Sequence, residues 1–140
     1  MATPQGILTE RLRSALEAAR LDSSRAVVVP TADPNFGDYQ TNAAMVIAHE
    51  HRRNPREVAA EILAALDVSG IAGAPTVAGA GFINFTLTGE FLSRQLAGVA
   101  SDPRIGLAPV ITPKTILIDF SSPNVAKPMH VCHKIGRAHV

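Results

Sequence analysis

The fold of this chain is decided by residues 76–87, TVAGAGFINFTL. Two runs rich in β-branched and aromatic residues flank a Gly-Ala-Gly turn, which is the pattern of a β-hairpin. In the second run Ile83 and Phe85 share one face of the strand, and Phe82 and Asn84 share the other. We expect the Ile83 and Phe85 face to lie in the core, so that Phe82 and Asn84 project from the opposite face.

Helical periodicity surrounds the hairpin on both sides. Helices are expected at about residues 5–20, at about 39–51 with Asp38 as cap, and from the Asn54-Pro55 pair onward. A β-branched run within residues 25–31 predicts a strand. Thr88 is expected to cap a last helix whose inward side chains are Phe91, Leu92, Leu96 and Val99. This order predicts an α+β fold in which an antiparallel sheet packs against helices.

Domain boundaries follow from proline spacing. Three prolines fall within residues 103–113, which we interpret as a linker between a first domain, residues 1–102, and a second that begins at 114. The apolar run at residues 115–120 is expected to be the first strand of the second domain. Residues 134–140, KIGRAHV, look like a translated sequencing adapter, so we expect a non-native tail; genuine divergence is the alternative.

Composition bounds the class of protein. Hydrophobic residues make up 46% and charged residues 18% of the 140 residues, which is typical of a folded domain. No apolar run approaches the roughly 20 residues that cross a membrane, and we expect no membrane association. The single Cys suits the cytoplasm, where we place the protein, and the scattered His residues form no metal-ligand set. The net charge of +1 is too balanced to indicate general nucleic-acid binding.

Two groups of side chains could contact a nucleic acid. An aromatic ring beside an amide, as at Phe82 and Asn84, is how proteins hold an unstacked RNA base; the alternative is that Phe82 packs under a helix and Asn84 satisfies a turn. Residues 51–53 and 56, His-Arg-Arg and Arg, form a basic cluster at a helix–helix junction. We interpret this cluster as a solvated turn, with phosphate contact as the alternative.

Residues 36–42, FGDYQTN, are interpreted as a structural loop. Gly37 suits a turn, Asp38 suits the helix cap, and the amides of Gln40 and Asn42 are expected to bond to the loop backbone.

Residues 121–133, SSPNVAKPMHVCH, carry the chemistry. A Ser-Ser-Pro-Asn turn follows the apolar run, and His130 and His133 are spaced to share one face of a helix. Imidazole N–H groups and the ammonium of Lys127 are suited to holding negative charge on a phosphate during in-line displacement. A helix N-terminus would add free backbone N–H groups and a partial positive charge.

This stretch closely resembles the first signature of arginyl-tRNA synthetases, the arginine form of the class I His-Ile-Gly-His motif. Residues 36–44 and 79–85 are also similar to blocks of that family, so the resemblance covers residues 1 to about 133. It implies that residues 1–102 are the N-terminal additional domain, which binds the tRNA D-loop. Residues 114–133 would then begin a truncated Rossmann-like catalytic domain.

The resemblance also implies roles for individual residues. His130, His133 and Lys127 would be catalytic and, with Cys132, would lie at the ATP site. Three residues would bind arginine, namely Asp119, Ser122 and Asn124. Without the resemblance, Asp119 would be interpreted as an end-of-strand turn residue. Phe82 and Asn84 would read a D-loop base.

One departure from the family pattern bears on activity. Cys132 stands where the family has Gly, and its Cβ should obstruct the adenine ring.

The sequence therefore predicts the N-terminal part of an arginine–tRNA ligase. The full-length enzyme would use ATP with Mg as substrate, arginine and tRNA(Arg), without a tightly bound cofactor and as a monomer. This part is expected to bind tRNA and to be catalytically incomplete. The alternatives are a stand-alone RNA-binding module without catalysis and, less favoured by the Ser-Ser-Pro-Asn turn, another nucleotidyltransferase with a His-x-x-His motif.

Overall fold

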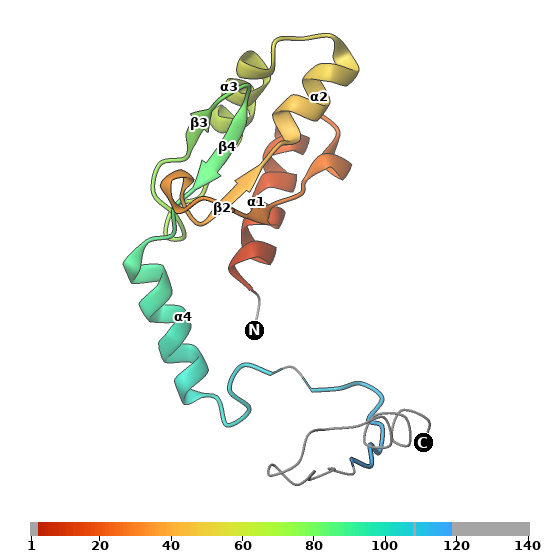
Figure 1. Ribbon diagram of the computed structural model, residues 1–140, viewed down its shortest axis with the longest axis vertical. Helices are drawn as coiled ribbons and strands as arrows, with labels where there is room; N and C mark the ends of the chain where they lie inside the picture. The colour runs from red at the N-terminus through yellow and green to blue at the C-terminus, as the bar shows by residue number, and fades with distance from the viewer. Residues whose placement is uncertain (1–2, 108, 119–140) are drawn as a thin grey trace, which may run out of the picture. The chain divides into compact units, whose positions relative to one another are not determined.

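The computed structural model describes residues 3–107 and 109–118 (Figure 1). The chain divides into two compact units, residues 1–108 and 109–140. In the described part, the elements are α1 (Pro4–Ala18), the 3-10 turn η1 (Ser23–Arg25), β1 (Val29–Pro30), the 3-10 turn η2 (Pro34–Phe36), β2 (Tyr39–Thr41), α2 (Ala43–His51), α3 (Pro55–Ala65), β3 (Thr76–Ala78), β4 (Phe82–Phe85) and α4 (Gly89–Ser101). All of them lie in the first unit.

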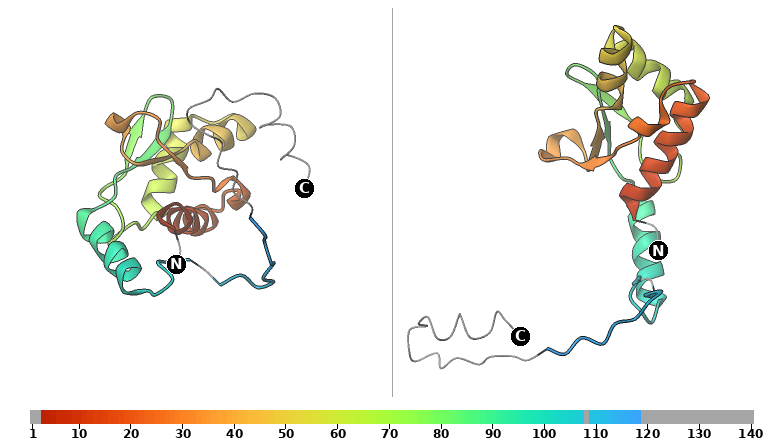
Figure 2. Two further views of the ribbon diagram at one scale, coloured as in Figure 1. Left: turned by 60° about the horizontal axis from the view of Figure 1, so that its bottom comes forward. Right: turned by 90° about the vertical axis from the view of Figure 1, so that its right-hand side faces the viewer.

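The four strands form one antiparallel sheet in the order β1-β2-β4-β3. The predicted hairpin is confirmed as β3 and β4, with Ala78 opposite Phe82 at the turn. Helices α1, α2 and α3 lie together on one side of the sheet (Figure 2). The chain is therefore an α+β fold, as predicted, with one covered and one more open sheet face.

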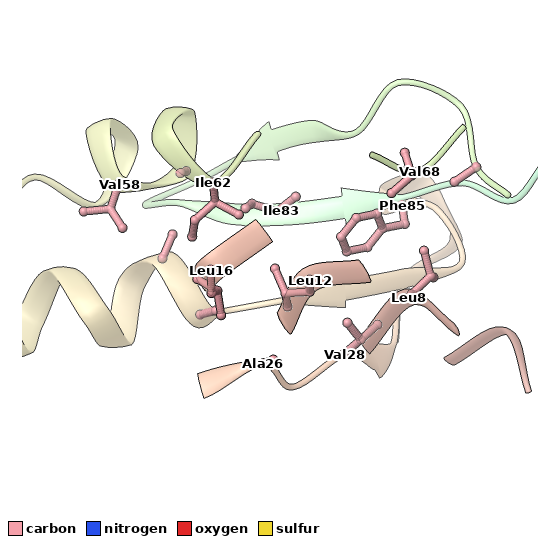
Figure 3. Packing of buried hydrophobic residues seen from close by; sticks show 14 of the residues in the cluster. Leu8, Leu12, Leu16, Ala26, Val28, Val58, Ile62, Val68, Ile83 and Phe85 are labelled. Atoms are coloured by element: carbon pink, nitrogen blue, oxygen red, sulfur yellow. The ribbon is translucent and has the colours of Figure 1, made fainter. Parts of the chain in front are cut away.

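The core fills the space between the sheet and these three helices (Figure 3). Ile83 and Phe85 are fully buried, which confirms the predicted core face of the hairpin. Each helix contributes side chains spaced three or four residues apart, as an amphipathic helix requires. The largest of these helical side chains are Leu8, Leu12 and Leu16 of α1, Ile47 of α2, and Val58 and Ile62 of α3.

Side-chain caps define where the helices begin. Asn54 Oδ1 accepts a hydrogen bond from Arg56 N at 3.0 Å and starts α3, with Pro55 in the first turn. Thr88 Oγ1 accepts from Phe91 N at 3.2 Å and starts α4. Both predicted caps are confirmed, because a short polar side chain satisfies a backbone N–H that has no partner within the helix.

The predicted helix at residues 39–51 is wrong at its beginning. Tyr39–Thr41 is strand β2, paired with β4, and α2 starts only at Ala43. Asp38 does not cap it: Asp38 Oδ2 accepts from Leu87 N at 2.8 Å, across the sheet. Asn42 is the N-cap residue but makes no side-chain cap bond. Pairing with β4 overrides the local helix signal, because tertiary context outweighs propensity.

The predicted strand at residues 25–31 is shorter than expected. Asp22 Oδ1 accepts from Ser24 N at 2.9 Å and starts the η1 turn, which takes Arg25 out of the strand. Only Val29 and Pro30 pair with β2. β1 is an edge strand, where a Pro without an N–H is tolerated.

Helix α4 does not bury the stripe expected of it. Phe91 is buried, but Leu92 is 48% and Leu96 69% exposed. Only the start of α4 meets the sheet layer, and the rest of the helix runs away from it (Figure 1). Near the end of α3, Ala65 is exposed, whereas Ala59 lies in the core.

The second predicted domain, residues 114–133, is described only at residues 114–118. Residues 115–118 of the expected strand are not in a strand, because a strand needs a hydrogen-bonded neighbour and none faces them in the described part of the chain.

Candidate functional site

The open face of the sheet carries the candidate site. In the β2–β4 register Gln40 lies opposite Asn84, and Thr41 lies opposite Ile83. Residues directly opposite on antiparallel strands share a face. Gln40 and Asn84 are therefore on the face away from the core, while Thr41 is buried beneath the helices with Ile83.

A pocket of about 240 Å³ opens on this face. Phe82 and Asn84 of β4 and Gln40 of β2 line it, together with Phe36, Ala78 and Gly79. Phe36 comes from η2 and is 49% exposed, while Phe82 is half-buried. The pocket thus combines two aromatic rings with two carboxamide side chains, a pairing that suits a planar ring with polar edges.

Asn84 has an unusual environment. Its side chain is only 4% exposed, and its Oδ1 atom has no hydrogen-bond partner. A buried acceptor left without a partner costs about 1–3 kcal/mol, so such atoms in a folded protein call for an explanation. The accessible area of Oδ1 is below 1 Å², so a donor in the pocket reaches this atom only if the carboxamide turns toward the pocket.

The η2 side of the pocket is held to β4 by backbone contacts. Asp38 N donates to Phe85 O at 2.8 Å, and the Asp38 carboxylate accepts from Leu87 N. Gly37 has a φ of +89°, and a Cβ at this position would lie 2.7 Å from Phe85 O. Only glycine combines that dihedral with so close an approach of two backbones, which confirms the turn predicted at Gly37.

The hairpin side of the pocket is held by the start of α3. The Arg56 guanidinium donates to Gly79 O from Nε at 3.3 Å and from Nη2 at 3.2 Å. Gly81 packs against Pro55: a Cβ on Gly81 would lie 3.0 Å from Pro55 Cβ. These contacts fix the turn that precedes Phe82, so the aromatic ring of Phe82 extends from a hairpin that is held in place by α3.

The structure thus brings together the two side chains predicted to contact a base, Phe82 and Asn84. Phe82 lies on the sheet face away from the helices, and Asn84 Oδ1 has no hydrogen-bond partner among the described residues. Sequence reasoning missed Phe36 and Gln40, which were interpreted as parts of a structural loop. The signal available for Gln40 was the alternation of faces along Tyr39-Gln40-Thr41. This signal is weak because strand β2 is only three residues long.

The predicted residues of the synthetase signature lie outside the described residues. These are Asp119, Ser122, Asn124, Lys127, His130, Cys132 and His133.

Among the described residues, no group of three or more His, Cys, Asp or Glu side chains lies close enough together to hold a metal ion. No helix in that part of the chain is long and apolar enough to span a bilayer.

Comparison with known families matches both halves of the chain to synthetases that attach amino acids to tRNA. Residues 6–87 match the arginyl tRNA synthetase N terminal domain, and residues 104–137 match the catalytic domain of class I (R) tRNA synthetases. The chain belongs to the arginyl-tRNA synthetase family.

Individual relatives agree with this assignment. The arginine–tRNA ligase of Laribacter hongkongensis is 41% identical over 127 residues, and that of Chromobacterium violaceum is 44% identical over 127 residues. The arginine–tRNA ligase of Vibrio vulnificus strain YJ016 is 45% identical over 130 residues. The matches cover 91–92% of this chain but 22% of each relative, so the chain spans about a fifth of their length.

A solved structure shows the same fold at low identity. The arginyl-tRNA synthetase of Plasmodium falciparum superposes with a TM-score of 0.57 at 19% identity, covering 66% of this chain and 17% of that one. At this identity the likeness concerns the fold alone.

Proposed function

We propose that this chain binds transfer RNA by taking one unstacked D-loop base into the pocket on the open sheet face. Phe82 stacks on the base, and Asn84 contacts its edge. The observation that carries the proposal is the pocket itself, in which Phe82 and Asn84 lie together with Phe36 and Gln40. An acceptor in that position matches a base that presents an exocyclic amine or a ring N–H.

Gln40 adds a second carboxamide to this site. It lies opposite Asn84 on β2 and lines the same pocket. Carboxamides both donate and accept hydrogen bonds, so two of them can satisfy neighbouring donor and acceptor atoms on one base edge. The discrimination between bases is therefore assigned to Asn84 and Gln40, and the affinity for an unstacked ring to Phe82.

For the longer protein we propose the activity that its relatives' names state, ligation of arginine to tRNA. We place this activity in the cytoplasm, with tRNA(Arg) as the acceptor and ATP with Mg as the activating substrate. His130, His133 and Lys127 would hold the ATP phosphates, with Cys132 at the same site. Asp119, Ser122 and Asn124 would hold arginine. The match of residues 104–137 to a catalytic domain supports this reading over a stand-alone RNA-binding module.

The test is tRNA binding by the 140-residue chain at fixed salt, since phosphate contacts make affinity salt-dependent. Stacking on one aromatic contributes roughly 1–3 kcal/mol, so Phe82→Ala should weaken binding about 5- to 150-fold. Asn84→Ala and Gln40→Leu should chiefly reduce the preference among D-loop base variants. Leu96→Ala, which removes an exposed apolar side chain of α4, is the matched control and should bind normally.

Circular dichroism separates recognition from packing. If Phe82→Ala unfolds the domain, Phe82 is a packing residue and the proposal fails. A folded Phe82→Ala chain that binds tRNA as tightly as the parent would also rule out base stacking.

A further inference from the structure

The α2–α3 junction carries a basic surface that the base pocket does not use. Its side chains are His49, His51, Arg52, Arg53 and Arg56, all exposed. Arg52 ends α2 in the left-handed conformation with φ of 52°, and its N–H donates to Ala48 O and His49 O. The chain then turns within two residues into α3. This tight junction gathers the basic side chains at one edge of the domain.

Not all of this charge is neutralised. Arg53 forms a two-point ion pair with Glu61, Nη1 donating to Oε2 at 3.0 Å and Nη2 to Oε1, and this pair lowers the pKa of Glu61. Glu50 is paired with Arg25. Among the described residues, no carboxylate oxygen lies within 4.0 Å of the guanidinium of Arg52 or Arg56. Arg56 instead donates to Gly79 O, which keeps its full positive charge available.

A groove of about 920 Å³ runs along this surface. Its lining includes His49, Glu50, Arg52, Arg53 and Pro55, and Arg56 follows Pro55 in the first turn of α3. Pro55 packs against Gly81, and Arg56 holds Gly79, which lines the base pocket. The groove and the pocket therefore adjoin across the hairpin turn, and Arg56 connects them because it follows Pro55 and is bonded to Gly79.

We propose that this groove binds the sugar–phosphate backbone of the RNA strand whose base occupies the pocket, with Arg52 and Arg56 each contacting a phosphate. Guanidinium groups match phosphate geometry and remain charged at every physiological pH. Such contacts fix the register of a bound strand without reading its sequence. The inference rests on the proposed function, because the pocket supplies the strand.

The experiment measures tRNA affinity of the 140-residue chain from about 50 to 200 mM salt, for the parent, Arg52→Gln, Arg56→Gln, Arg56→Lys and Arg94→Gln. Each lost phosphate contact makes the slope of log affinity against log salt shallower by roughly 0.7–0.9. Between about 50 and 200 mM salt, the fold-loss of affinity of each Gln variant should therefore be about threefold smaller than the fold-loss of the parent. Binding should weaken equally for every D-loop base variant.

Arg94→Gln is the matched control for Arg56. Arg94 is also an exposed arginine that donates to a backbone carbonyl, Gly70 O at 3.0 Å, but it lies on α4. Its slope should equal the parent's. Arg56→Lys separates charge from bracing: it should keep the parent's slope if Arg56 contacts a phosphate.

Two results would overturn the inference. One is an unchanged salt slope in Arg52→Gln and Arg56→Gln while Phe82→Ala still weakens binding, which leaves the base pocket intact as a proposal. The other is a slope change as large in Arg94→Gln, which would reflect net charge alone. Failure of the proposed function has a different signature, since Phe82→Ala would then bind normally. Arg56→Gln removes a bond to the hairpin turn and could unfold the domain, whereas Arg52→Gln removes no side-chain bond in the described part of the chain. If only Arg56→Gln unfolds, the salt slope of Arg52→Gln decides the test.

Discussion

At the scale of the residue, Gly37 links the backbone to the pocket. Its φ of +89° and the 2.7 Å approach of a Cβ to Phe85 O mean that any other residue must push η2 away from β4. Phe36, one wall of the pocket, directly precedes it. The position therefore controls both stability and the placement of an aromatic side chain.

We predict that Gly37→Ala destabilises the chain by more than about 1 kcal/mol, because it combines a left-handed dihedral with a backbone clash. The midpoint of urea unfolding measures this. Gly89→Ala is the control: nothing lies within 4 Å of a Cβ there, and Gly89 begins helix α4, so stability should be unchanged or slightly higher. Equal midpoints for Gly37→Ala and the parent would contradict the close-approach argument.

Some residues of the pocket could be predicted from the sequence, and some could not. Phe82 and Asn84 follow from the period of two in a strand long enough to show which face is apolar. Gln40 could not be placed, since β2 pairs over only Tyr39–Thr41 and is followed at once by a helical pattern. The burial of Asn84 depends on η2 folding over the sheet, which no local pattern encodes.

At the scale of the element, the helix caps and the hairpin were predictable because their signals are local. Asn54 and Thr88 act through neighbours two or three residues away. Asp38 was misassigned because its partner, Leu87, is 49 positions distant. Likewise, the apolar residues of α4 recur with a helical period. That period does not show that only the start of α4 contacts the sheet, so it could not predict that Leu92 and Leu96 are exposed.

Helix α3 is tied to the preceding junction by Arg53 and Glu61, and this pair should respond to acid. Arg53 lowers the pKa of Glu61 from its ordinary value of 4.5. The pair's contribution to stability is therefore present above pH 4.5 and is lost as the pH falls through the lower, folded value.

We predict that Glu61→Gln lowers stability relative to the parent near pH 7 but not below the folded pKa of Glu61. Urea midpoints measured from pH 7 down to pH 3 test this. Glu17→Gln on α1, whose carboxylate makes no ion pair among the described residues, should follow the parent throughout. A difference in urea midpoint between Glu61→Gln and the parent that stays constant from pH 7 to pH 3 would contradict the stabilising role of the Arg53–Glu61 ion pair.

At the scale of the whole molecule, the residues proposed for recognition and those proposed for chemistry lie in different parts of the chain. The base pocket and the basic groove both lie in the unit of residues 1–108, whose core is continuous between sheet and helices. The residues proposed to hold ATP and arginine lie at positions 119–133. This separation means that tRNA binding and amino-acid activation can be tested independently.

We predict that the 140-residue chain shows no arginine-dependent ATP–pyrophosphate exchange, with or without tRNA. It spans about 22% of the relatives' length, and by the resemblance Cys132 is expected to stand where the family has glycine. A heat-treated sample provides the background rate. Exchange clearly above that background would show that these residues suffice for activation.

An abasic scan tests whether one D-loop base enters the pocket beside Phe82. Each D-loop nucleotide of the tRNA is replaced in turn by one without a base, and binding to the parent chain and to Phe82→Ala is measured at fixed salt. We predict that a single position weakens binding to the parent by about 5- to 150-fold and has no effect on Phe82→Ala. Equal binding of every abasic tRNA to the parent chain would contradict the claim.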